Sequence, residues 1–281
     1  MSNVNPQRVA FQGEPGAFSE LAALRFFGTR TRTLSCTSFE EVFRAVAAGT
    51  ATAGIVPVEN SIFGSIHQNY DLLLRSKLHV IGELKLRIRL NLLGLPGSSF
   101  RSITTVLSQP QALGQCERFL RKLKGVHVEA VHDTAGAARI VRESGDLAVA
   151  AVASRRAGSL HGLSVLRSDV EDDPRNFTRF LVVSGKPVRT HRDSKTSIVC
   201  ALRHVPGSLH ALLGVLASAG VNLLALESRP MPGKPWEYLF YMDLSGSVSE
   251  PRVASALKAA QSLCIFLRVL GSYRRGRTYS R

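Results

Sequence analysis

The sequence lacks long apolar runs, closely spaced cysteines and an apolar N-terminal segment. No apolar run approaches the roughly 18–20 residues that a membrane-spanning helix needs. Residues 1–8 are polar and lack the apolar core of a signal peptide. These absences argue against a protein with membrane-spanning helices. We therefore expect a cytoplasmic protein with no membrane partner.

Cysteine and histidine show no pattern typical of a metal site. The four cysteines lie far apart, without a C-x-x-C pair, in apolar or helical contexts where a buried thiol is common. They are Cys36, Cys116, Cys200 and Cys264. The eight histidines have no ligand spacing with Cys or Asp. The sequence therefore predicts no metal site.

Acidic residues are few, because 36 Lys and Arg stand against 21 Asp and Glu, which gives a net charge of +15. Such a balance suits nucleic acid, and it suits an anionic small substrate equally well. The arginines are spread along the chain, with one dense cluster at residues 273–277. The charge leaves both interpretations open. Because no helix-turn-helix, zinc-finger or RNP pattern is present, we expect no nucleic-acid partner.

A unit of strand, tight turn and helix repeats through the first two thirds of the 281 residues. Residues 8–11 have strand composition, a Gly-Pro turn follows, and residues 17–27 have helical spacing. The same order recurs from the strands expected at residues 53–58, 103–107, 126–131 and 147–152. Strands that alternate with helices predict an α/β fold with largely parallel sheets.

Polar residues follow these strands at the same step of the repeat. They are Gly13, Gly16, Glu59, Asn60, Ser61, Ser108, Gln115 and Thr134. The turns after parallel strands gather at one sheet edge, and small hydrogen-bonding residues at helix N-termini suit a carboxylate or phosphate. Taken singly, each Ser, Thr or Asn is better explained as an N-cap. Their common position favours an anion site.

Two segments are expected to connect two lobes. Residues 83–95 alternate like a strand, and residues 163–180 form the return connection. Two lobes joined by two strands form a cleft, with Thr178 at its floor. An acidic loop precedes Thr178 and Arg179, and an apolar strand follows them. Either Arg179 pairs with a nearby Asp of that loop, or the hydroxyl and guanidinium mark a functional site; the spacing leaves both open.

A polar linker at residues 186–195 separates this two-lobed unit, residues 7–185, from a second domain at residues 196–273. The second domain has the order βαββαβ, which is the ferredoxin-like arrangement. Its polar features are the Gly207 turn and the strand end at residues 227–230. With so little chemistry in it, we interpret it as a binding module.

The motifs, taken together and in this order, resemble the prephenate dehydratase family with a C-terminal ACT domain. They are the opening G-E-P-G-A-F-S, V-E-N-S at 58–61, S-Q-P-Q at 108–111, N-F-T-R-F at 176–180, P-G-S-L at 206–209 and E-S-R-P at 227–230. The resemblance covers residues 7–273. It implies two α/β lobes around a cleft, as in periplasmic binding proteins, plus a regulatory ferredoxin-like ACT domain.

The resemblance also implies an activity: prephenate loses water and carbon dioxide to give phenylpyruvate, in phenylalanine biosynthesis, without a cofactor. Thr178 would help the ring hydroxyl to leave. The substrate would be held by Glu59, Asn60, Ser61, Ser108, Gln115, Thr134 and Arg179. Phenylalanine would inhibit from a site between the subunits of a dimer or tetramer, formed by Gly207, Ser208, Leu209, Glu227, Ser228 and Arg229. Ser208 stands where the family more often has alanine.

Three alternatives stay open at this point. An arogenate dehydratase would act on the amino counterpart of the keto substrate. Two lobes around a cleft also describe solute-binding proteins, although these are generally exported. An amino-acid-sensing regulator that binds nucleic acid would use the positive charge and the second domain.

Overall fold

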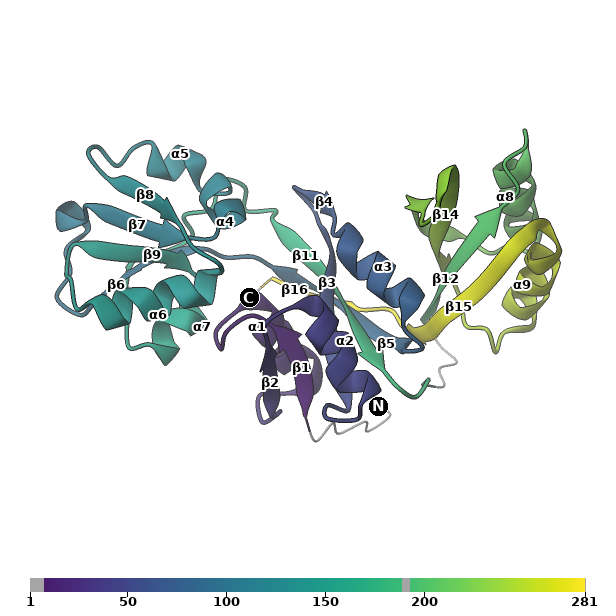
Figure 1. The fold of residues 1–281 in the computed structure, drawn as a ribbon, viewed down its shortest axis with the longest axis horizontal. Helices are drawn as coiled ribbons and strands as arrows, with labels where there is room; N and C mark the ends of the chain where they lie inside the picture. The colour runs from purple at the N-terminus through teal and green to yellow at the C-terminus, as the bar shows by residue number, and fades with distance from the viewer. Residues whose placement is uncertain (1–7, 189–192, 281) are drawn as a thin grey trace.

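The computed structural model describes residues 8–188 and 193–280, and three β-sheets organise this part of the chain (Figure 1). Residues 1–7 of the polar start, and residues 189–192 of the expected linker, lie outside the described residues. Among the described residues, no helix is long and apolar enough to span a membrane.

The first lobe contains a mixed sheet in the order β16-β5-β11-β3-β1-β2, with β4 paired to β3. Its strands are β1 (Val9–Gln12), β2 (Thr33–Cys36), β3 (Ala53–Asn60), β4 (Gly64–Ser65), β5 (His79–Arg87), β11 (Phe177–Ser184) and β16 (Arg277–Tyr279). Its helices are α1 (Phe18–Phe27), α2 (Phe39–Ala47) and α3 (His67–Arg75). β2 and α2 were not expected from the sequence.

The second lobe contains a sheet in the order β10-β6-β9-β7-β8. Its strands are β6 (Asn91–Gly94), β7 (Thr105–Ser108), β8 (His127–Ala130), β9 (Val149–Ala153) and β10 (Ser164–Arg167). Its helices are η1 (Phe100–Ser102), α4 (Pro110–Gly114), α5 (Glu117–Leu120), α6 (Thr134–Ser144) and α7 (Arg155–Leu160).

Two connections join the lobes, as the sequence predicts. β5 of the first sheet leads directly to β6 of the second, and β10 leads back to β11. Because β11 comes from the second lobe, it starts at the edge where β3 and β5 end and runs antiparallel to both. The expectation of largely parallel sheets is therefore wrong: both sheets are mixed, since β6 is also antiparallel to β9.

The third sheet, in the order β13-β14-β12-β15, is antiparallel throughout. Its elements are β12 (Ser194–Leu202), α8 (Ser208–Ser218), β13 (Leu223–Met231), β14 (Lys234–Ser245), α9 (Pro251–Leu263) and β15 (Cys264–Arg274). This is the βαββαβ order that the sequence predicts. The first lobe lies between this domain and the second lobe (Figure 1).

The third sheet buries both of its faces. On one face, Met242 packs with Leu212 of α8 and Val253 of α9. On the other face, Tyr241 packs against Tyr70 of α3, with ring centroids 4.9 Å apart, and its hydroxyl donates to the Tyr70 carbonyl at 2.9 Å. The domain is therefore fixed to the first lobe through a buried sheet face rather than joined only by its linker.

The two lobes also touch each other on one side of the cleft. Gly16 has a φ of +98°, and a Cβ at this position would come within 2.7 Å of the Cα of Ala157. Ser154 donates to the Gly16 carbonyl at 2.6 Å, and Arg156 pairs with Glu20 at 2.7 Å. Only glycine permits this backbone approach, which explains the second glycine of the opening motif.

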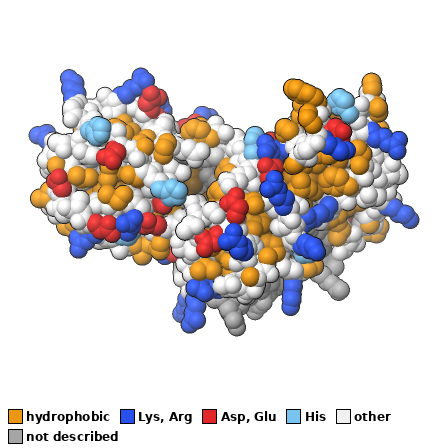
Figure 2. All heavy atoms as spheres, in the orientation of Figure 1, with side chains coloured by type: hydrophobic (Ala, Val, Ile, Leu, Met, Phe, Trp, Pro, Cys, Tyr) orange, Lys and Arg blue, Asp and Glu red, His pale blue; other side chains and the backbone are white. Residues whose placement is uncertain are grey.

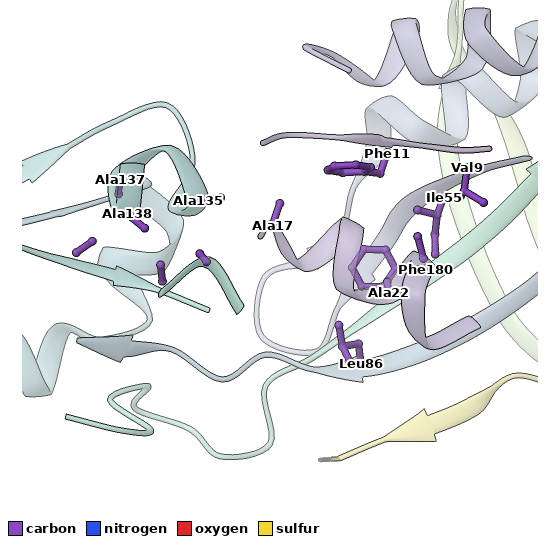
Figure 3. Packing of buried hydrophobic residues seen from close by; sticks show 14 of the residues in the cluster. Val9, Phe11, Ala17, Ala22, Ile55, Leu86, Ala135, Ala137, Ala138 and Phe180 are labelled. Atoms are coloured by element: carbon purple, nitrogen blue, oxygen red, sulfur yellow. The ribbon is translucent and has the colours of Figure 1, made fainter. Parts of the chain in front are cut away.

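The largest apolar cluster continues across this contact (Figure 3). Phe11, Ile55 and Phe180 fill the first-lobe part, while Ala135 and Ala138 of α6 supply small side chains in the second lobe. Small residues at this point allow the lobes to meet closely without leaving cavities. On the face in Figure 2, Lys and Arg side chains are scattered over all three parts rather than gathered in one patch.

The end of the chain returns to the first lobe. β15 packs closely on β5, and β16 then pairs parallel with β5 at residues 84–86. A Cβ at Gly271 or at Gly276 would overlap a backbone carbonyl oxygen of β5. Glycine at these two positions is therefore required for the third domain to dock.

We predict that Gly271→Ala destabilises the protein by about 1–3 kcal/mol or more, because the new methyl group meets backbone that cannot rotate away. Gly214→Ala, in helix α8 of the same domain, meets no atom within 4 Å. This matched control should be neutral or stabilising by up to about 1 kcal/mol. Urea unfolding measures both, and equal stability of the two variants would contradict the docking described here.

Candidate active site

A cavity of about 470 Å³ lies between the two lobes. Asn60 and Thr178 line it from the first lobe, and Gln115 and Thr134 line it from the second. These four predicted site residues are far apart in the sequence, and the two-lobed fold brings them together. A cavity of this size accommodates a small organic molecule.

A hydrogen-bond chain fixes the direction of the Thr178 hydroxyl. Thr178 lies directly opposite Asn60 in the pairing of β11 with β3. The side-chain oxygen of Asn60 accepts from the backbone N–H groups of Ile62 and Phe63 at 3.0 and 3.1 Å. Its amide nitrogen therefore faces the other way and donates to Thr178 Oγ1 at 3.0 Å and to Asn176 Oδ1 at 2.8 Å. Thr178 thus accepts from Asn60 and keeps its own proton for a ligand.

Helix N-termini rather than cations face the cavity. Ala17 precedes α1 and Ile66 precedes α3; both residues line the cavity, and neither helix has a side-chain cap. Uncapped amide groups and the helix dipole favour a negative group at such positions. None of the lining residues is Lys or Arg. That backbone amides hold an anion here stays a prediction.

Arg179 does not lie where the sequence analysis placed it. Successive residues of a strand point to opposite faces, so Thr178 faces the cavity while Arg179 faces the third domain. The Arg179 guanidinium is buried, 2.8 Å from Glu83 and 2.5 Å from Asp243. Neither earlier alternative describes this: Arg179 pairs with no Asp of the preceding loop, and its charged group is directed away from the cavity.

Three further predicted substrate-binding residues have side chains outside the cavity lining. Ser108 is fully buried and donates to the Val152 carbonyl at 2.5 Å, so it holds β7 to β9. The Ser61 hydroxyl makes hydrogen bonds with the backbone of residues 175–177. The Glu59 carboxylate is half exposed on the same face of the sheet as Arg179. These residues support the walls of the site rather than face its interior.

Several polar lining residues were not singled out from the sequence: Gln12, Ser19, Ser65, Gln68, Gln109, Gln111, His132 and Asp133. Most of them stand in or beside the turns that the repeat had already marked. The useful signal was therefore the turn as a whole, and selecting single residues within a turn left out neighbours such as His132 and Asp133, which stand beside Thr134. The described residues contain no group of three or more His, Cys, Asp or Glu that could hold a metal ion.

Behind the cavity wall, a buried network of charges joins the first lobe to the third domain. Lys195 of β12 lies 3.0 Å from Glu83 and 3.3 Å from Asp243, which both also contact Arg179. Burial alone would raise the pKa of Asp243, but the charges of Arg179 and Lys195 outweigh it and hold this pKa below its usual value. The same balance lowers the pKa of Glu83. Both carboxylates are therefore ionised at neutral pH.

The six predicted effector residues fall into two places. Ser208 and Leu209, beside Gly207, line a surface cavity of about 390 Å³ with Tyr238 and Phe240. Ser228 is exposed on β13, opposite Phe240 on β14.

Glu227 and Arg229 instead face the first lobe. Glu227 contacts Ser65 at 2.7 Å and His67 at 3.0 Å, and Arg229 pairs with Asp71 of α3 at 2.8 Å. Within one subunit, Glu227 and Arg229 therefore lie apart from Ser208 and Leu209, because the alternation along β13 sends them to the interdomain face.

Two α/β lobes around a cleft, attached to a ferredoxin-like domain, define a class of two-lobed cleft proteins with an additional C-terminal domain. Residues 9–188 match the family model described as prephenate dehydratase, and residues 196–261 match the model described as ACT domain. The chain belongs to the prephenate dehydratase family and carries a C-terminal ACT domain.

Curated and solved relatives are similar to this chain over most of its length. Arogenate dehydratase/prephenate dehydratase 1 of Arabidopsis thaliana is 42% identical over 282 residues, which cover 95% of this chain and 71% of the relative. Prephenate dehydratase from Arthrobacter aurescens, solved in complex with L-Phe, superposes with a TM-score of 0.87 at 31% identity, covering 95% of this chain and 90% of the relative. GqqA, described as a novel type of quorum quenching acylase, has a TM-score of 0.88 at 35% identity, with 95% and 98% covered.

The predicted family, fold class and enzyme class are confirmed by these comparisons. The chain is a dehydratase, which favours the enzyme over the solute-binding and nucleic-acid-regulator alternatives. The arogenate alternative stays open, because the Arabidopsis relative carries both names.

Asp243→Asn would leave Arg179 and Lys195 buried with Glu83 as the one buried carboxylate of the network. We expect the variant to lose about 3–5 kcal/mol of stability at neutral pH, which is the usual effect of breaking a buried pair. Urea unfolding at pH 7 measures this loss. Glu117→Gln, which breaks an exposed pair on α5, should change stability by less than about 1 kcal/mol.

The same network predicts a dependence on pH. The pKa of Asp243 is lower in the folded state than in the unfolded state. The contribution of its carboxylate to folding stability is therefore complete above the unfolded-state pKa, and it is lost as the pH falls through the folded-state pKa. Wild-type stability should therefore fall more steeply than that of Asp243→Asn as the pH drops below about 4. Parallel acid profiles for the two proteins would contradict a depressed pKa at Asp243.

Proposed function

We propose that this dehydratase converts prephenate to phenylpyruvate in the interlobe cleft, as a step of phenylalanine biosynthesis. The bond between the ring and its carboxylate breaks, carbon dioxide leaves, and the electron pair of that bond enters the ring. The bond from the opposite ring carbon to its hydroxyl breaks with its electron pair on oxygen. That oxygen takes up a proton and leaves as water, and the ring becomes aromatic, which drives the reaction.

The observation that carries this proposal is the orientation of the Thr178 hydroxyl. Since Asn60 donates to its oxygen, the Thr178 proton is directed to the cavity, where a leaving oxygen would accept it. A threonine hydroxyl is a poor acid, so its contribution is a hydrogen bond that strengthens as negative charge grows on the leaving oxygen. A donor held in place before the reaction stabilises such charge without reorganisation.

The carboxylates of the substrate are assigned to backbone amides. The uncapped N-termini of α1 and α3 offer N–H donors, and Gln115 and Thr134 add side-chain donors from the second lobe. Glu59, Ser61 and Ser108 hold the strands and loops that carry these groups. Direct substrate contact by Arg179 is not retained in this proposal, because its guanidinium is committed to Glu83 and Asp243.

Thr178→Val keeps the shape of the side chain and removes its hydroxyl. We expect kcat to fall about 10²- to 10³-fold, the range for loss of one oriented donor, with a much smaller change in KM. Thr178→Ser should keep most of the activity. Phenylpyruvate formation from prephenate measures both, and a valine variant with wild-type kcat would remove Thr178 from the mechanism.

We also propose that phenylalanine regulates the enzyme through the ACT domain, in a homodimer or homotetramer. The surface cavity beside Gly207, Ser208 and Leu209 is the proposed effector site. We assign residues 7–185 to catalysis, residues 186–195 to the linker and residues 196–273 to regulation. A cytoplasmic location, the lack of a cofactor and the lack of a nucleic-acid partner stay predictions.

Glu227 links regulation to the cleft in this proposal. It contacts Ser65, which also lines the catalytic cavity, and His67, the first residue of α3. A movement of β13 on effector binding would therefore displace the start of α3, whose amides face the substrate. Glu227 acts as a coupling residue here, instead of the effector contact that the motif alone implies.

Glu227→Ala tests this assignment. We expect phenylalanine to bind as in the wild type, measured by calorimetry, while the concentration for half-inhibition rises at least about fivefold. Glu237→Ala, on the neighbouring strand and paired only with Lys234 among the described residues, is the control and should change neither value. Loss of phenylalanine binding in Glu227→Ala would assign the residue to the effector site itself and contradict the coupling role.

A further inference from the structure

The lining of the cleft has an unusual charge composition for a site that takes an anion. Asp133 is its one carboxylate, none of the lining residues is Lys or Arg, and His132 is the only other titratable side chain. A dianion such as prephenate therefore meets a negative group and no permanent cation on these walls. A substrate that brings its own positive charge would meet a partner.

Asp133 is placed to be that partner. It is the N-cap of α6, and its Oδ1 accepts from the Gly136 N–H at 2.7 Å, which leaves Oδ2 available. Asp133 forms no ion pair with any residue that the structure describes. The neighbouring carboxylate, Glu14, is different because Arg139 binds both of its oxygens, at 2.9 and 3.0 Å. The unpaired negative charge at this wall is therefore that of Asp133.

The position of Asp133 also fits the shape of the substrate. Thr178 belongs to the first lobe, and Asp133 belongs to the second lobe, where it precedes α6. In prephenate and its amino counterpart, the hydroxyl and the three-carbon side chain stand at opposite ends of the ring. A hydroxyl that contacts Thr178 therefore directs the side chain toward the second lobe. Because Asp133 already caps α6, this helix N-terminus is a poor place for a carboxylate.

We propose that Asp133 is a specificity-determining residue, which binds the ammonium group of arogenate and lets the enzyme use this amino acid in addition to prephenate. This inference rests on the proposed function, since it concerns the same cleft and the same loss of water and carbon dioxide. The ammonium takes no part in bond breaking. The product from arogenate is phenylalanine rather than phenylpyruvate, so each reaction can be followed separately.

Asp133→Asn is the informative variant, because asparagine is nearly isosteric and is also a good N-cap. We expect kcat/KM for arogenate to fall at least about tenfold, as for loss of a hydrogen bond between charged groups. We expect kcat/KM for prephenate to stay the same or rise, because a like charge has been removed. Asp146→Asn is the matched control: its Oδ1 accepts from the Ala148 N–H at 2.8 Å, outside the cavity lining, and the ratio of the two kcat/KM values should not change.

The outcomes separate this inference from the proposed function. If the wild type converts prephenate and not arogenate, the role of Asp133 is wrong and the proposed function stands. If it converts neither, the proposed function itself fails. Equal losses for both substrates in Asp133→Asn would show a structural role and overturn the inference. If Asp133→Asn proves unstable in thermal unfolding, Asp133→Ser replaces it, because serine also caps the helix and carries no charge. The ratio of the kcat/KM values for arogenate and prephenate must then fall in Asp133→Ser as expected for Asp133→Asn.

Discussion

The pairing of β3 with β11 is the constraint on which the rest of the structure depends. It sets Thr178 opposite Asn60 on the cleft face, and the strand period then sends Arg179 to the opposite face, against the ACT domain. A shift of the register by one residue would exchange these two side chains, placing a guanidinium in the cleft and a hydroxyl among buried charges. Two hydrogen bonds from the Asn60 amide help to fix the register, so the active site and the domain interface are determined together.

Burying four charges at that interface is costly, and the arrangement is stable only when the set is complete. Taking an ion out of water costs several kcal/mol, and paired charges recover this only with good geometry. Here Glu83 and Asp243 each contact both Arg179 and Lys195, and Ser197 donates to Asp243 at 2.5 Å. A slight displacement of the ACT domain would leave partners unpaired in an apolar setting. The main effect of the network is therefore to specify a single docking position of the ACT domain, and its net contribution to stability is smaller.

The sequence was sufficient for the two lobes, their connecting strands and the βαββαβ domain, because these depend on period and order along the chain. Helix α2 was missed, although the sequence carries a signal for its start: Ser38 and Glu41 have the S-x-x-E spacing of a capping box, and the Ser38 hydroxyl accepts from the Glu41 N–H. The wrong placement of Arg179 could have been avoided from the sequence alone, because adjacent residues of a strand point to opposite faces and cannot both face one cleft. The pairing of residues 277–279 with β5 could not be predicted from the sequence, because a short polar strand is stabilised only by the sheet edge with which it pairs, and that edge is distant in the chain.

Several arginines of the chain lie where its parts meet, and none lines the ligand site. Arg156 and Arg139 pair across the two lobes, and Arg179 and Arg229 pair across the interface with the ACT domain. The cleft is lined instead by uncharged donors, among them the side chains of Gln115 and Thr134 and, in the proposed function, the backbone amides at the starts of α1 and α3. Backbone amides at a helix start cannot reorient toward a ligand as long side chains can. The strength of their hydrogen bonds to a ligand therefore depends on the positions of α1 and α3. Since Glu227 contacts Ser65 and His67 at the start of α3, the proposed function makes anion binding in the cleft depend on the position of the ACT domain.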